Sequence, residues 1–169
     1  MSRAGEMQPI AFFVFQFLWF TLAWALIAAY VVWPWSKTLA LHQRLSLWVA
    51  PEMFRVLGLG LLVPNLSPEM PLSFALPTAI ADTVTSLLAV LAFIALQRSW
   101  QAARLLVWLC TIVGVSDLLV AFPHAASTGA IAHLHTQWYV PVFAGPVMVV
   151  AHAACIATLL GSRRPGPRG

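Results

Sequence analysis

Charged residues are what this sequence lacks most. Only 8% of its 169 residues are Asp, Glu, Lys or Arg, whereas ordinary soluble domains carry roughly 25%. Hydrophobic residues make up 61% of the chain, and its mean hydropathy is +0.87. So few polar side chains cannot cover a water-exposed surface. The composition therefore excludes a soluble globular protein.

Cysteines and the familiar enzyme motifs are also scarce. The two cysteines, Cys110 and Cys155, both fall inside apolar segments, so no disulfide framework is predicted. The chain has no phosphate-binding glycine loop, nucleophile elbow, HExxH motif or CxxC pair. Its net charge of +4 comes from basic residues spread over short links, which indicates positive-inside topology rather than a nucleic-acid-binding face. We predict no nucleic-acid partner and no cofactor.

Apolar stretches dominate what is present. The length allows four or five membrane crossings of roughly 20 residues each. We predict an all-α polytopic membrane bundle with five transmembrane helices. It forms one domain over residues 1–160, followed by a basic disordered tail over 161–169. The predicted spans are Pro9–Trp35, Leu45–Val63, Thr78–Leu96, Leu105–Phe122 and Pro141–Leu160.

The second predicted span, Leu45–Val63, admits an alternative because it contains Glu52 and Arg55. A spacing of three residues places both side chains on one helical face, where they can form an ion pair. Pro51 can open a helix there, with Glu52 near its positive end. The alternative is an interfacial or re-entrant helix, which would leave four spans.

Basic residues predict the orientation. The proline-containing stretches 64–77 and 123–140 carry no lysine or arginine and are predicted to be outer loops. The link 97–104 carries Arg98 and Arg104, and the C-terminal tail carries three more arginines. We therefore predict an inner- or plasma-membrane protein with its N-terminus outside and its C-terminus in the cytoplasm.

Two aspartates inside predicted spans are the strongest candidates for a functional site. If 78–96 and 105–122 form a hairpin, Asp82 and Asp117 lie at the same depth. A charge at mid-span costs roughly 2.5–3.5 kcal/mol on insertion, so both should face the bundle or a wet cavity. Two such carboxylates would resist joint ionisation and share a proton. The alternative is that each one hydrogen-bonds a neighbour and locks the hairpin.

Further polar residues extend this candidate ligand or proton site. Thr85 and Ser86 follow Asp82 at helical spacing on the same face. His152 lies in the middle of the last span and is assigned to the same site as a proton-relay candidate. A packing role for His152 is the alternative interpretation.

Three histidines in the second outer loop are weak metal-ligand candidates. His133 and His135 would point to one side of an extended segment, and His124 could supply a third ligand. No further Cys or His motif accompanies them. We therefore interpret them as solvated loop residues and predict no metal.

Three function classes remain open. The one we favour is a membrane protein with a buried acidic site near the outer leaflet, which binds or translocates a lipid-soluble small molecule or a cation. The second is a membrane enzyme that acts on a lipid- or isoprenoid-type substrate by acid–base catalysis. The third is an accessory subunit of a larger membrane complex. The predicted partners are the bilayer and a lipid-soluble molecule, with a homo-oligomer or larger assembly left open.

Overall fold

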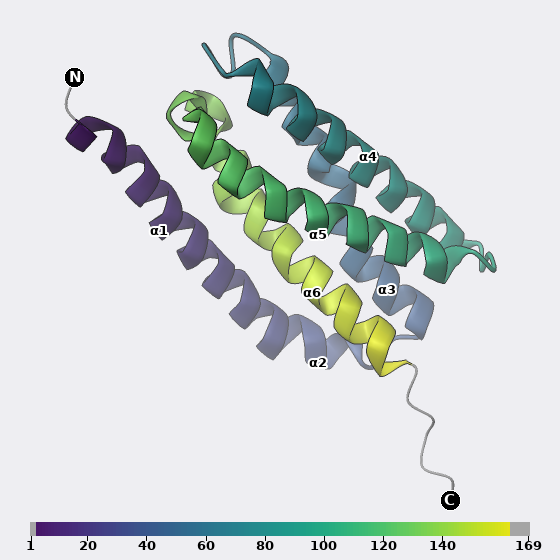
Figure 1. The fold of residues 1–169 in the computed structure, drawn as a ribbon. Coiled ribbons are helices and arrows are strands. Elements are labelled where there is room, and N and C mark those ends of the chain that lie inside the picture. Colours follow the sequence, from purple (N-terminus) through teal and green to yellow (C-terminus); the bar gives the residue numbers. More distant parts are fainter. Residues whose placement is uncertain (1–2, 163–169) are drawn as a thin grey trace, which may run out of the picture.

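The computed structural model describes residues 3–162 as one bundle of helices that run side by side (Figure 1). Five helical stretches are long and apolar enough to cross a membrane, which confirms the all-α, five-span prediction. They are Pro9–Ser36, Leu41–Leu62, Leu72–Gln97, Ala103–Thr128 and His135–Gly161. The last seven residues of the predicted tail lie outside the described part of the chain.

The spans combine α-helix with 3-10 and π segments. The α-helices are α1 (Arg3–Ile27), α2 (Trp33–Ser36), α3 (Leu41–Val49), α4 (Leu72–Gln97), α5 (Ala103–Thr128) and α6 (Gly145–Gly161). The π segments are η1 (Ala28–Val32) and η5 (Val140–Ala144). The 3-10 segments are η2 (Ala50–Leu62), η3 (Ala130–His133) and η4 (His135–Trp138).

Two helices extend through prolines that we predicted to lie in outer loops. Helix α4 begins at Leu72 and contains Pro77, and α5 continues to Thr128 and contains Pro123. Both predicted outer loops, 64–77 and 123–140, are therefore shorter in the structure than we predicted. Membrane helices tolerate an internal proline because neighbouring groups can satisfy the backbone atoms that it leaves free.

The second candidate span consists of α3 followed by η2, and together they are long and apolar enough to cross a membrane. Pro51 has no backbone N–H to continue the α-helical pattern, and the 3-10 segment begins next to it. A run of 13 residues is unusual, because 3-10 helices rarely exceed three or four residues. At about 2.0 Å per residue it rises roughly 26 Å, against roughly 20 Å for an α-helix. The 3-10 form therefore helps this short span to cross.

Helix α1 lies on the outside of the bundle (Figure 1). Only 6% of the most apolar stretch of the first span, Pro9–Ser36, is buried. The large side chains of Phe12 and Trp19 in α1 and of Tyr30 in η1 are exposed. The spans enclose two apolar cores, and α1 contributes Phe13 to the second. The first core gathers around Leu45, Ala92 and Leu159, and the second around Phe13, Phe74 and Ile131. The polar residues described next lie between these cores.

Candidate functional site

Arg55, in the second span, lies at the centre of a buried polar site. Its Nε donates a 2.8 Å hydrogen bond to Oδ1 of Asp82, and one terminal nitrogen donates to Oδ2 of Asp117. The other terminal nitrogen donates to the carbonyl oxygen of Gly114 at 3.3 Å. The side chain is only 1% exposed. The two aspartates therefore share a site, and the guanidinium between them compensates the repulsion that the sequence predicts.

The 3-10 geometry explains why the second span presents these groups together. The buried residues of η2 are Glu52, Arg55, Gly58 and Leu61, each three positions after the last. With 3.0 residues per turn, side chains three apart lie above one another. In an α-helix of 3.6 residues per turn the same positions would turn away from the interface. One straight stripe thus passes from Glu52 to the apolar Leu61.

Glu52 and His152 complete the site on the other side of Arg55. Oε2 of Glu52 lies 3.6 Å from a terminal nitrogen of Arg55 and 3.1 Å from Nε2 of His152. Neither contact has the geometry of a hydrogen bond. Both carboxylate oxygens of Glu52 and Nε2 of His152 are therefore buried without a hydrogen-bond partner. We call Glu52, Arg55, Asp82, Asp117 and His152 the charge cluster. It contains three carboxylates and one guanidinium, so it can accept further positive charge as protons or as a cation.

Two glycines make room for the charge cluster, and neither was among the predicted site residues, although Gly114 shares the helical face of Asp117. A methyl group on Gly58 would overlap the carboxylate of Asp82, and one on Gly114 would overlap the imidazole of His152. Gly58 follows Arg55 by three residues, and Gly114 precedes Asp117 by three. A glycine at helical spacing from an intramembrane charge is the signal that could have identified them.

The hydroxyl residues assigned to the site donate to backbone carbonyls and do not line the cavity described below. Oγ of Ser86 donates to the carbonyl oxygen of Met53 at 2.6 Å, which ties α4 to η2. Oγ1 of Thr85 donates to the carbonyl oxygen of Ala81 at 2.9 Å, within α4. His152 belongs to the charge cluster, but it does not line that cavity either.

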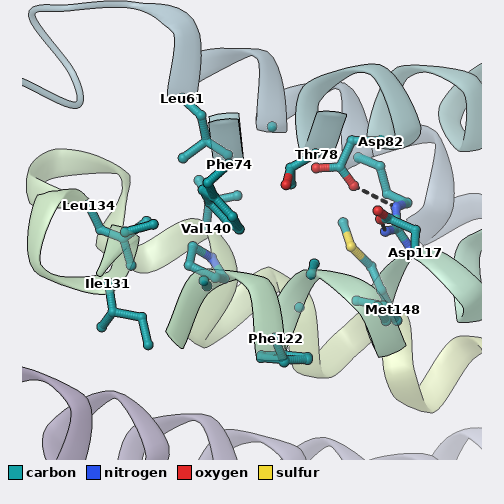
Figure 2. A pocket seen from close by; sticks show the side chains of 18 of the residues that line it. Leu61, Phe74, Thr78, Asp82, Asp117, Phe122, Ile131, Leu134, Val140 and Met148 are labelled. Atoms are coloured by element: carbon teal, nitrogen blue, oxygen red, sulfur yellow. Dashed lines mark hydrogen bonds and ion pairs between the residues drawn. The ribbon is translucent and has the colours of Figure 1, made fainter. Parts of the chain in front are cut away.

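A largely apolar cavity ends on the charge cluster. Figure 2 shows Thr78, Asp82 and Asp117 on one side of it and apolar side chains on the other. These labelled apolar residues include Leu61, Phe74, Phe122, Ile131, Leu134 and Val140. The volume of the cavity is about 100 Å³, which is smaller than the roughly 300–1,000 Å³ of typical small-molecule sites. Aspartates and Arg55 are the only charged groups that line it among the described residues.

The three histidines considered as metal ligands are not grouped as a metal site in the described part of the chain. The rings of His124 and Phe74 pack edge to face with centroids 5.7 Å apart. His133 ends η3 and His135 begins η4, so they occupy helical turns rather than the extended segment that we expected. Within residues 3–162, no three His, Cys, Asp or Glu side chains are grouped so that they could hold a metal ion.

Comparison with known proteins gives one match. No curated protein and no solved structure matches the chain. A family model matches residues 12–160, which include the whole charge cluster and every residue that lines the cavity. The chain therefore belongs to the family described as domain of unknown function DUF8737.

Proposed function

We propose that this protein binds, and hands on within the membrane, a lipid-soluble small molecule with a cationic or hydrogen-bond-donating head. The observation that carries the proposal is the cavity, which has apolar walls and ends on Asp82 and Asp117. An apolar body would replace lipid contacts along Phe74, Ile131 and Leu134, and its polar head would reach the carboxylates.

The exposed fractions of the charged side chains support a positive or donating head. The side chains of Asp82 and Asp117 are 16% and 9% exposed, whereas that of Arg55 is 1% exposed. The carboxylates therefore offer acceptors to a ligand, while the guanidinium lies behind them. Arg55 balances only one of these two negative charges. An ammonium group, or several hydroxyl groups that donate hydrogen bonds, would compensate the remaining negative charge of the two aspartates.

A second cleft supports access from the bilayer. It lies along α4 and α5, has a volume of about 390 Å³, and shares Thr78, Asp117 and Ala121 with the cavity. Exposed residues such as Ser116 and Val120 line its outer part. A lipid-soluble molecule could therefore approach Asp117 sideways between these two helices, without passing through water.

Acid–base catalysis receives less support from the same geometry. Glu52 and His152 are the pair best placed to exchange a proton, with 3.1 Å between Oε2 and Nε2. Neither residue lines the cavity, because Arg55 stands between them and its end. A substrate in the cavity would thus meet Asp82 and Asp117 first. This arrangement favours binding over chemistry.

Filling the cavity should abolish binding. Ala125 is buried and lines the cavity, while its neighbour Ala126 is exposed on the same helix. We expect Ala125→Leu to lose at least tenfold in affinity for a fluorescent long-chain alkylamine, because the added side chain occupies the ligand's space. Ala126→Leu, the matched control, should bind normally. Fluorescence titration in detergent micelles measures both.

The same titration tests the head-group chemistry. The wild type should bind the alkylamine more tightly than the corresponding alcohol, and Asp82→Asn should reduce that preference. Equal binding by the Ala125 and Ala126 variants would contradict the cavity as the site. Equal affinity for amine and alcohol, unchanged in Asp82→Asn, would contradict the role of the carboxylates.

We further propose that the N-terminus lies outside and the C-terminus in the cytoplasm. Arg98 and Arg104 sit at the α4–α5 link, on the side predicted to be cytoplasmic. A periplasmic- or outer-side-active reporter inserted after Glu69, in the exposed turn before α4, should be active. The same reporter after Trp100 should be inactive. The opposite pattern would reverse the orientation.

A further inference from the structure

A second polar cavity lies at the other end of the bundle from the acidic one. It is lined by residues of the α2–α3 link, the start of α3 and the end of α6. These segments come together at one end of the bundle (Figure 1). Its volume is about 310 Å³, and it is lined by Leu39, Leu41, Arg44, Thr158, Gly161 and Ser162. No carboxylate lines it among the described residues.

Two buried donors in this cavity have no partner. Thr158 is 2% exposed, and its Oγ1 makes no hydrogen bond. Nε of Arg44 is buried and also makes none. The Arg44 guanidinium lies over the ring of Trp33, 4.5 Å from its centroid, which holds it in place. A buried donor without a hydrogen-bond partner lowers the stability of the fold, so we expect an acceptor from a bound molecule at these two groups.

The start of α3 adds backbone donors at the same place. The helix begins at Leu41, and its N-cap residue, Ala40, has no side-chain oxygen to cap the free N–H groups. Its first turn contains no acidic residue. The N-terminal end of a helix carries a partial positive charge and favours an anion. Leu41 lines the cavity, so these groups border the same space as Arg44.

Further cations surround the cavity. Lys37 Nζ lies 6.0 Å from the centroid of the same Trp33 ring. Arg104 donates a 2.9 Å hydrogen bond to Oγ of Ser162, which lines the cavity. The acidic residues of the chain are distant from this end: three form the charge cluster, Glu6 lies near the start of α1, and Glu69 precedes α4. A local excess of positive charge thus surrounds the unpartnered donors.

We propose that this cavity is a binding site for a phosphate group, carried by an anionic phospholipid head or by free phosphate. Arg44, the Thr158 hydroxyl and the N-terminal amides of α3 would donate to its oxygens. The site lies where the second candidate span begins and the fifth ends, which is the depth of lipid head groups. It does not depend on the proposed ligand of the acidic cavity.

The test compares three probes on the purified protein in mild detergent. Phosphatidylglycerol carries the phosphate, diacylglycerol has the same acyl chains without it, and inorganic phosphate carries it alone. Native mass spectrometry counts bound lipid, and thermal unfolding reports stabilisation. The variants are Arg44→Gln and Thr158→Val, which removes the hydroxyl at nearly constant volume. Arg98→Gln is the control, because it also removes one positive charge but at an exposed position in the α4–α5 link.

We expect phosphatidylglycerol to bind and raise Tm while diacylglycerol does not. Arg44→Gln should weaken binding at least tenfold and Thr158→Val several-fold, with Arg98→Gln close to wild type. Stabilisation by inorganic phosphate alone, lost in Thr158→Val, would identify free phosphate as the ligand. Equal binding of phosphatidylglycerol and diacylglycerol would overturn the proposal, as would equal losses in Thr158→Val and Arg98→Gln. The Thr158 variant keeps the test valid if Arg44→Gln does not fold.

Discussion

Arg55→Met should destabilise the protein by about 3–5 kcal/mol, the usual consequence of removing one partner from a buried ion pair. Arg55 is 2% exposed, and its guanidinium forms ion pairs with three carboxylates, those of Glu52, Asp82 and Asp117. Without it, buried negative charges would face one another uncompensated. Reversible unfolding in detergent with increasing denaturing surfactant measures the change.

Neutralising the carboxylates that Arg55→Met leaves without a partner should restore part of the lost stability. Adding Glu52→Gln to Arg55→Met should recover some stability, and adding Asp82→Asn with Asp117→Asn should recover more. The two aspartates lie in direct hydrogen bonds to Arg55, whereas Glu52 is 3.6 Å away. Arg98→Met, at an exposed position, is the control and should be nearly neutral. Strictly additive losses would show that these residues do not interact.

Gly114→Ala should also destabilise, by about 1–3 kcal/mol as for other overpacked sites. This sign is the reverse of the usual one, since alanine in place of a mid-helix glycine normally stabilises by roughly 0.5–1 kcal/mol. The new methyl group would overlap the imidazole of His152 and come within 3.0 Å of the Thr85 methyl carbon. Both neighbours are buried, so neither can move aside into solvent. Thermal unfolding in detergent measures the effect.

Two further variants isolate the cause. Gly161→Ala is the matched control, because nothing lies within 4 Å of the added carbon, and it should be neutral or slightly stabilising. Combining Gly114→Ala with His152→Ala should return part of the lost stability by opening space. A stabilising effect of Gly114→Ala alone would mean that His152 does not pack against this glycine.

The number of candidate spans and the proximity of the two aspartates could be predicted from the sequence. Apolar runs of about 20 residues can satisfy their backbone in lipid only as helices, so composition determines the architecture. An antiparallel hairpin with a short link also fixes which residues lie level. Thr85 accordingly lies beside Gly114, since a carbon added to that glycine would come within 3.0 Å of the Thr85 methyl carbon. The helix ends were less predictable, since Pro77 and Pro123 are typical of loops in water but occur inside helices here.

The partner of the aspartates could be decided only by the tertiary structure. Arg55 lies 27 residues before Asp82 and 62 before Asp117, and no local spacing rule links positions so far apart. We could predict its pairing with Glu52, which follows from a separation of three residues within one helix. Its contacts with the other two spans depend on how η2 packs against α4 and α5.

The cavity likewise depends on packing rather than on any one segment. The sequence by itself determined five helices long and apolar enough to cross a membrane, with two carboxylates at matching positions in a hairpin, because hydrophobic run length and helix rise are local properties. Tertiary structure decided that a 13-residue 3-10 segment aligns Arg55 with Gly58 and Leu61, and that the spans leave an empty space beside them. Whether packed helices enclose a void depends on the fit of side chains from several spans at once, which no single stretch of sequence specifies.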